Sequence, residues 1–230
     1  MELSGKTILV VGASGSLGSN ITMQMISAGA TVLVSASSVE SAEKIPGGVA
    51  LRLVLDLANP ASVQGVVEHL LSLATPIDGV VIASGLVGFG SALETSTTDS
   101  STLMMVNYQG PAMLITHLLP SLIARAAETG SGFIAGISGL VAEKAFLGMS
   151  AYSASKSAFS SYLAGLGLEL RRHKITVLDA RPGHTETGLA GRAIFGSAPA
   201  FPAGMTANHV ASVIVAGIID GKRELASTDF

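Results

Sequence analysis

The chain has 230 residues, of which 48% are hydrophobic and 13% are charged, with a formal net charge of −3 and no cysteine. This length suits one large α/β domain with a sizeable core. The absence of a Lys/Arg cluster argues against nucleic acid as a partner. The absence of cysteine excludes disulfides, thiol catalysis and cysteine-ligated metal sites.

The remaining composition predicts a cytoplasmic protein with no membrane partner. The first residues, "MELSGKTILVV", lack the basic start and long apolar run of a secretory signal. The apolar stretches are interrupted before they reach the roughly 18 residues that a membrane span requires. The five histidines are scattered, with no carboxylate at a metal-ligand spacing, so no metal site is expected.

Short, almost continuously apolar runs alternate with longer stretches of helical periodicity. The runs read as strands buried on both faces, at 6–11, 31–35, 49–54, 78–83, 132–137 and 175–180, with a short last strand at 223–227. Helices are predicted at 17–28, 60–74, 99–128, 150–173 and 206–220. Since no linker or repeat divides the chain, this alternation predicts an α/β fold, a doubly wound parallel sheet in a single domain, residues 1–230. Ligands of such sheets bind at the carboxyl ends of the strands.

A glycine-rich turn, "VGASGSLGSN", follows the first strand. Gly12, Gly15 and Gly18 are three residues apart, and a helix begins near Leu17. Glycine lets a pyrophosphate approach the backbone, and the N-terminus of the helix offers free N–H groups and partial positive charge. The turn predicts a dinucleotide site that includes Ser14 and Ser16, although an ordinary strand-to-helix turn has similar composition.

One aromatic hydroxyl and one ammonium stand four residues apart in "SAYSASKSAF", residues 150–159. On a helix, Tyr152 and Lys156 share one face. An ammonium about 4–5 Å from a phenol favours the phenolate by roughly 3–4 kcal/mol at an effective dielectric of about 20. We therefore expect Lys156 to lower the pKa of Tyr152 and make it a proton-transfer residue. The alternative is surface decoration.

Together these motifs resemble the short-chain dehydrogenase/reductase family over residues 5–226. "AYSASKSA" is similar to the Tyr-x-x-x-Lys segment of that family, and the glycine turn resembles its T-G-x-x-x-G-x-G pattern, with Val11 and Ser16 as departures. The resemblance implies a Rossmann fold and hydride transfer between a nicotinamide cofactor and a carbonyl or alcohol. In that reaction Tyr152 would move the proton and Lys156 would also hold the nicotinamide ribose.

The resemblance also implies a serine that hydrogen-bonds the substrate oxygen. Ser138 is the candidate, but the commoner spacing to the tyrosine is one residue shorter and reaches Gly139. Either a one-residue insertion restores Ser138 or the serine is missing, with Ser150 a weaker substitute. A hydrolase nucleophile elbow would need glycine where Leu140 stands.

Asn107 in "MMVNYQG" matches the asparagine that interrupts a helix locally and holds a water linking to the lysine; otherwise it is a buried polar residue. "IASG", residues 82–85, stands where the family has N-N-A-G. Ser84 and Gly85 are expected at the cofactor, whereas Ile82 and Ala83 replace both asparagines.

The residues expected at the adenosine are Ser37 and Ser38 after the second strand, and Asp56 and Leu57 after the third. No carboxylate stands at 36–38 to repel a 2′-phosphate, and no arginine to demand one. The preferred cofactor is therefore NADP, with NAD possible. Asp56 would meet the adenine, or else cap the following helix.

"ARPGHTETG", residues 180–188, matches the Pro-Gly loop after the sixth strand. The residues expected there at the carboxamide or pyrophosphate are Pro182, Gly183, His184, Thr185 and Thr187. Residues 189–205 follow in the place of the substrate loop. Phe195, Phe201 and Met205, with Phe146, Leu147 and Met149, would line an apolar pocket or simply pack.

The resulting prediction is an NAD(P)-dependent oxidoreductase with a small carbonyl or alcohol substrate, assembled as a homodimer or homotetramer through the helices within 99–128 and 150–173. Two alternatives remain. One is a dinucleotide-binding sensor or scaffold without turnover. The other is an epimerase or dehydratase on the same fold, for which the short C-terminus leaves little room for a substrate lobe.

Overall fold

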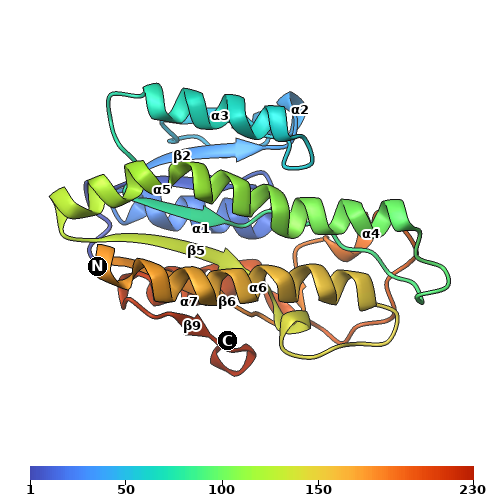
Figure 1. Ribbon diagram of the computed structural model, residues 1–230. Coiled ribbons are helices and arrows are strands. Elements are labelled where there is room, and N and C mark those ends of the chain that lie inside the picture. Colours follow the sequence, from blue (N-terminus) through green and yellow to red (C-terminus); the bar gives the residue numbers. More distant parts are fainter.

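A computed structural model describes residues 1–230 and shows a central parallel sheet between two layers of helices (Figure 1). The strands of the central sheet run in the order β3-β2-β1-β4-β5-β6-β9, and every pair is parallel. They are β1 (Thr7–Val11), β2 (Thr31–Ala36), β3 (Leu51–Val54), β4 (Gly79–Ile82), β5 (Gly132–Ile137), β6 (Ile175–Ala180) and β9 (Glu224–Leu225). The predicted doubly wound Rossmann sheet in a single domain is confirmed.

Each face of the sheet is covered by its own helices, because the strands are apolar on both faces. The helices are α1 (Ser16–Ser27), α2 (Val39–Glu43), α3 (Pro60–Ser72), α4 (Thr97–Met104), α5 (Gly110–Thr129), α6 (Ser150–Leu170) and α7 (Ala207–Ile219). Buried residues of α3, α5 and α6 form one core with β1, β4 and β5. Those of α1 and α7 form the other. In Figure 1, α5 and α6 cross the front of the sheet.

Local sequence explains where several helices begin. The Asn59 side chain accepts the N–H of Ala61 at 3.0 Å, and Pro60 occupies the first turn of α3, as the Asn-Pro pair predicts. Thr206 caps α7 by accepting the N–H of His209 at 3.2 Å. Glycine in a left-handed conformation ends α5 at Gly130.

The structure departs from the predicted elements at three places. The predicted helix 99–128 is two helices joined by a π-helical turn, Met105–Gln109, and it begins at Thr97. The short helix α2 was not predicted because only five residues form it. A second, two-stranded sheet pairs β7 (Thr185–Glu186) with β8 (Met205–Thr206), bringing the two ends of the 189–205 loop together.

The chain order changes direction between β1 and β4, since β2 and β3 lie to one side and β5, β6 and β9 to the other. At such a switch point the loops after two neighbouring strands diverge and leave a crevice at the carboxyl edge. The glycine turn after β1 and the segment after β4 both lie there. This edge is where the predicted site residues gather.

Candidate active site

The turn between β1 and α1 is built so tightly that only glycine fits at two of its positions. Gly12 has φ +84°, and a Cβ there would lie 2.7 Å from the backbone nitrogen of Ser84. A Cβ at Gly18 would lie 2.3 Å from the carbonyl oxygen of Gly12. The end of β1, the end of β4 and the start of α1 therefore meet without intervening side chains.

Hydrogen-bond donors at this turn remain free. The backbone N–H groups of Ser14, Ser16, Leu17 and Gly18 have no partner within the protein, and α1 has no side-chain cap. The hydroxyl of Ser84, on the adjacent β4 segment, is buried and also lacks a partner. Free N–H groups at a helix N-terminus are what a pyrophosphate requires, so these residues fit the predicted dinucleotide.

Tyr152 and Lys156 lie one turn apart on the buried face of α6. Lys156 is 6% exposed and its Nζ donates to the carbonyl oxygen of Ile137, at the end of β5, at 2.8 Å. Tyr152 is 9% exposed and packs with Val87, Phe89 and other apolar residues. Surface decoration is therefore not the explanation for this pair.

The electrostatics of the pair differ from the expectation drawn from their spacing. Burial raises the pKa of Tyr152 to about 12. Burial also lowers the pKa of Lys156 to about 8, although the negative charge of Asp179 acts in the opposite direction. The expected lowering of the Tyr152 pKa by Lys156 is therefore wrong for the protein alone. Desolvation disfavours both charged forms, and the ammonium is turned toward the Ile137 carbonyl.

Asn107 occupies the π-helical turn between α4 and α5, where the helix is locally interrupted as expected. Its Oδ1 accepts the N–H of Leu86 at 2.8 Å, and its Nδ2 donates to the Leu86 carbonyl oxygen and to Ser155 Oγ, both at 2.9 Å. A Cβ at Gly85 would lie 3.1 Å from Lys156 Nζ and 3.2 Å from Asn107 Oδ1. Gly85 therefore keeps open the space in which Lys156 and Asn107 converge.

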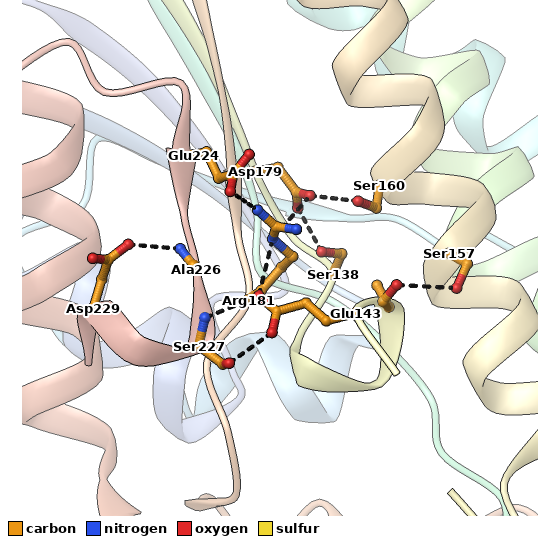
Figure 2. Close-up of polar contacts among 11 residues, drawn as sticks. Ser138, Glu143, Ser157, Ser160, Asp179, Arg181, Glu224, Ala226, Ser227 and Asp229 are labelled. Atoms are coloured by element: carbon orange, nitrogen blue, oxygen red, sulfur yellow. Dashed lines mark hydrogen bonds and ion pairs between the residues drawn. The ribbon is translucent and has the colours of Figure 1, made fainter. Parts of the chain in front are cut away.

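Ser138 does not turn toward Tyr152. Its side chain is fully buried, and its hydroxyl donates to Asp179 Oδ1 at 2.5 Å (Figure 2). Gly139, which the commoner spacing would make the catalytic position, has φ +82° and no side chain. Ser150 lies at the start of α6 and lines a cavity of about 370 Å³ with Ser153 and Ser157. This geometry does not support Ser138 or Ser150 as the donor to a substrate oxygen.

The residues predicted at the adenosine lie at the ends of β2 and β3, as the sheet order requires. Ser38 accepts the N–H of Ser41 at 3.1 Å and caps α2, while Ser37 is exposed. Asp56 Oδ1 accepts the N–H of Ala58 at 2.9 Å, so this carboxylate closes its own loop, and the cap of the following helix α3 is Asn59 instead. Leu57 is buried, and a Cβ at Gly110 would lie 2.3 Å from its carbonyl oxygen.

The loop after β6 is held mostly by its own backbone and short side chains. Thr185 Oγ1 donates to the Gly183 carbonyl oxygen at 3.0 Å, and Thr187 Oγ1 accepts the N–H of Leu189 at 3.3 Å. The ring of His184 stacks on Phe201 with centroids 4.6 Å apart. The loop therefore fixes the His184 side chain against the 189–205 segment.

The 189–205 loop is docked onto the segment that follows β4. Ile194 N–H donates to the Val87 carbonyl oxygen at 2.9 Å, and Phe89 N–H donates to the Phe195 carbonyl oxygen at 3.0 Å. Phe146, Met149 and Phe195 pack in the apolar cluster around Tyr152, which agrees with both expectations, a pocket wall and ordinary packing. Leu147 is fully exposed and Met205 packs on the opposite core, so these two do not belong to that cluster.

The family model for short chain dehydrogenase matches residues 6–194. The chain belongs to the short-chain dehydrogenase family. A dehydrogenase/reductase SDR family protein 7-like from Anopheles gambiae is 31% identical over 211 residues, covering 87% of this chain and 65% of the relative. This short-chain dehydrogenase therefore spans less than two thirds of that relative's length.

Solved structures share the fold of this short-chain dehydrogenase. A short chain dehydrogenase from Burkholderia cenocepacia in complex with NADP has a TM-score of 0.83 at 22% identity, covering 98% of this chain and 89% of the other. A 3-ketoacyl-(acyl-carrier-protein) reductase from Brucella melitensis complexed with NADH has a TM-score of 0.86 at 20% identity, covering 99% of both chains.

None of the helices of this short-chain dehydrogenase combines the length and hydropathy of a membrane span.

Two parts of the site were missed from the sequence of this short-chain dehydrogenase. One is the segment Val87–Phe89, whose signal is the alternation of glycine with apolar residues in "GLVGFG". The other is Asp179, an acid near the end of a strand that otherwise reads as apolar, "ITVLDA". A carboxylate in such a place is rarely without a partner.

Proposed function

We propose that this short-chain dehydrogenase transfers hydride between a nicotinamide cofactor and a carbonyl/alcohol pair, with Tyr152 as the proton donor and acceptor. The observation that supports it is the convergence of Lys156, Asn107 and Gly85 beside the free N–H groups of the glycine turn. The cofactor supplies and accepts the hydride when bound. The protein residues bind it, orient it and move the proton.

The electrostatics favour reduction of a carbonyl. Because burial raises the pKa of Tyr152 to about 12, the phenol keeps its proton at neutral pH and can donate it to a developing alkoxide. Lys156, with a pKa of about 8, is mostly an ammonium at neutral pH and can stabilise the phenolate that remains. Asn107 would hold a water molecule through which the proton lost by Tyr152 is replaced.

For the cofactor we propose a preference for NADP over NAD. The end of β2 carries Ala36, Ser37 and Ser38 and no carboxylate, so nothing there repels a 2′-phosphate, and exposed Ser37 can donate to it. The N–H groups of Ser14, Ser16, Leu17 and Gly18 would bind the pyrophosphate. Pro182–Thr187 would face the nicotinamide carboxamide. The first assignment is supported by the free N–H groups of the glycine turn, and the second by the position of the loop after β6.

The test combines thermal denaturation with absorbance of the reduced nicotinamide. We expect NADPH to raise Tm more than NADH does at the same concentration, since a ligand that binds the folded state stabilises it. We expect turnover with members of a carbonyl panel. Tyr152→Phe should retain the Tm shift but lose at least about 10²-fold in kcat.

The outcomes separate the alternatives. A Tm shift without turnover on any carbonyl or alcohol would favour the sensor or scaffold, which the lack of a serine hydroxyl directed from the end of β5 toward Tyr152 supports. Product formation without net oxidation of the cofactor would favour the epimerase or dehydratase. No Tm shift with either cofactor would refute the dinucleotide site.

A further inference from the structure

A buried carboxylate that the proposed reaction does not use lies between β6 and α6. Asp179 is 8% exposed and accepts two serine hydroxyls, Ser138 Oγ on Oδ1 and Ser160 Oγ on Oδ2, each at 2.5 Å. Figure 2 shows Ser138 and Ser160 pointing at the carboxylate from two different parts of the chain. Both oxygens of Asp179 are therefore fixed by short hydrogen bonds.

Both serines are neighbours of the groups that position Lys156. Ser160 lies one turn beyond Lys156 on α6, as Lys156 lies one turn beyond Tyr152, so the three share a face of the helix. Ser138 directly follows Ile137, whose carbonyl oxygen accepts the Lys156 ammonium at 2.8 Å. Asp179 thus joins the end of β5 to the helix that carries Tyr152 and Lys156.

The charge of Asp179 is only loosely neutralised by its other neighbours. Arg181 Nε is 3.7 Å from Oδ2, whereas the same guanidinium is 3.4 Å from Glu143 and also pairs with Glu224 (Figure 2). Around Lys156, Tyr152 is a neutral phenol and Asn107 is uncharged. Asp179 is the charged group that acts on Lys156, raising its pKa against the effect of burial.

We propose that Asp179 is a positioning residue for the reaction, holding the end of β5 against α6 through Ser138 and Ser160 and placing a fixed negative charge behind the Lys156 ammonium. This inference rests on the proposed function, because it assigns the role through Lys156. It also explains why the Ser138 hydroxyl is directed into the protein.

Asp179→Asn is the direct test, because the amide keeps the shape and removes the charge. Without that charge the pKa of Lys156 falls further, so the ammonium is lost at lower pH. We expect the alkaline limb of the kcat/KM profile for NADPH-dependent reduction to move down by about one pH unit or more, roughly a tenfold loss near pH 8.

Asp78→Asn is the matched control. Asp78 is also buried and accepts the Thr7 N–H at 2.8 Å and Arg125 Nε at 2.9 Å, but it precedes β4 at the opposite edge of the sheet. It should lower Tm without moving the pH profile. A pH profile for Asp179→Asn that coincides with wild type, with a lower Tm, would show a purely structural role and overturn the proposal.

Two further measurements keep the test decisive. If Asp179→Asn does not fold, Ser160→Ala should lower kcat several-fold while Ser160→Thr, which keeps the hydroxyl, restores it; equal kcat in all three proteins refutes the proposal. If the wild-type protein shows no turnover, the proposed function fails. The role of Asp179 is then judged from the ¹³Cε resonance of Lys156, assigned with Lys156→Arg, which must titrate at lower pH in Asp179→Asn.

Discussion

The Ser138 hydroxyl donates its hydrogen bond to a carboxylate inside the protein, whereas Gly139 next to it has no side chain. The site consequently has a tyrosine, a lysine and an asparagine in place, but no serine hydroxyl from the end of β5. A carbonyl oxygen in this site would receive its proton from Tyr152 without a second donor at that position. This predicts a weaker catalyst than the residue set alone would suggest.

Gly139→Ser should therefore increase kcat/KM for carbonyl reduction by about tenfold. This gain is smaller than the roughly 10²–10³-fold effect on kcat of a donor in a preorganised site. There is space for the side chain, since a Cβ at Gly139 would meet nothing nearer than the Pro182 carbonyl oxygen at 3.7 Å. The left-handed backbone should cost ~1–2 kcal/mol of stability. Steady-state kinetics and urea denaturation measure the two effects.

Gly130→Ser is the control for this change, because Gly130 has φ +81° and no neighbour within 4 Å of its Cβ, and it lies before β5, at the opposite edge of the sheet from Gly139. It should lose similar stability with unchanged kcat/KM. If Gly139→Ser loses activity to the same extent as stability, the missing hydroxyl is not what limits the reaction.

At the scale of elements, the loop 189–205 packs against the cluster that contains Tyr152. Its residues Ile194 and Phe195 exchange backbone hydrogen bonds with Val87 and Phe89, and its ends are tied by the β7–β8 pair. Glycine makes this docking possible, because a Cβ at Gly88 would lie 2.2 Å from Phe195 Cε1. The Phe195 ring thus rests directly on backbone.

Gly88→Ala should displace the Phe195 ring and loosen the loop over the site. We expect KM for the carbonyl substrate to rise several-fold with a smaller change in kcat, since the loop holds substrate and does not move the proton. Gly191→Ala, in the same loop with nothing within 4 Å of its Cβ, is the matched control and should change neither. An unchanged KM in Gly88→Ala would contradict a role of the 189–205 loop in substrate binding.

The elements themselves were largely predictable, because β-branched apolar runs and capped amphipathic stretches have strong periodic signals. The strands 132–137 and 175–180 were predicted at their observed bounds. The resemblance also predicted a local interruption of the helix at Asn107, and a π-helical turn lies there. The docking of Ile194 on Val87 was not predicted, since it depends on a contact between distant segments. For the site, the sequence spacing predicted that Tyr152 and Lys156 lie side by side. It did not predict their pKa values, because those depend mainly on burial in the folded protein.

At the scale of the whole molecule, buried charge is confined to the two edges of the sheet. Asp78 ties the amino edge through Lys6 and Arg125, and Asp179 ties the carboxyl edge through Ser138 and Ser160. Asp78 is paired with two cations, whereas Asp179 is held mainly by serine hydroxyls, and no buried charge lies in the strands between these two edges. The edge at the switch point can therefore carry reactive groups without disturbing the core.

The outer surface of α6 bears on the assembly of the protein. Ala164 and Leu168 are exposed one turn apart, and Leu168 is 65% exposed. If the expected homodimer or homotetramer buries this face, Ala164→Arg should place a charge in the interface and reduce the sedimentation mass to half or less of the wild-type value. Arginine favours the helix nearly as much as alanine, so the single chain should fold normally. The control is Leu71→Arg, since Leu71 is 51% exposed on α3, and it should leave the sedimentation mass unchanged. Assembly through α6 would be contradicted by a wild-type mass of one chain. It would also be contradicted by equal masses for wild type and Ala164→Arg.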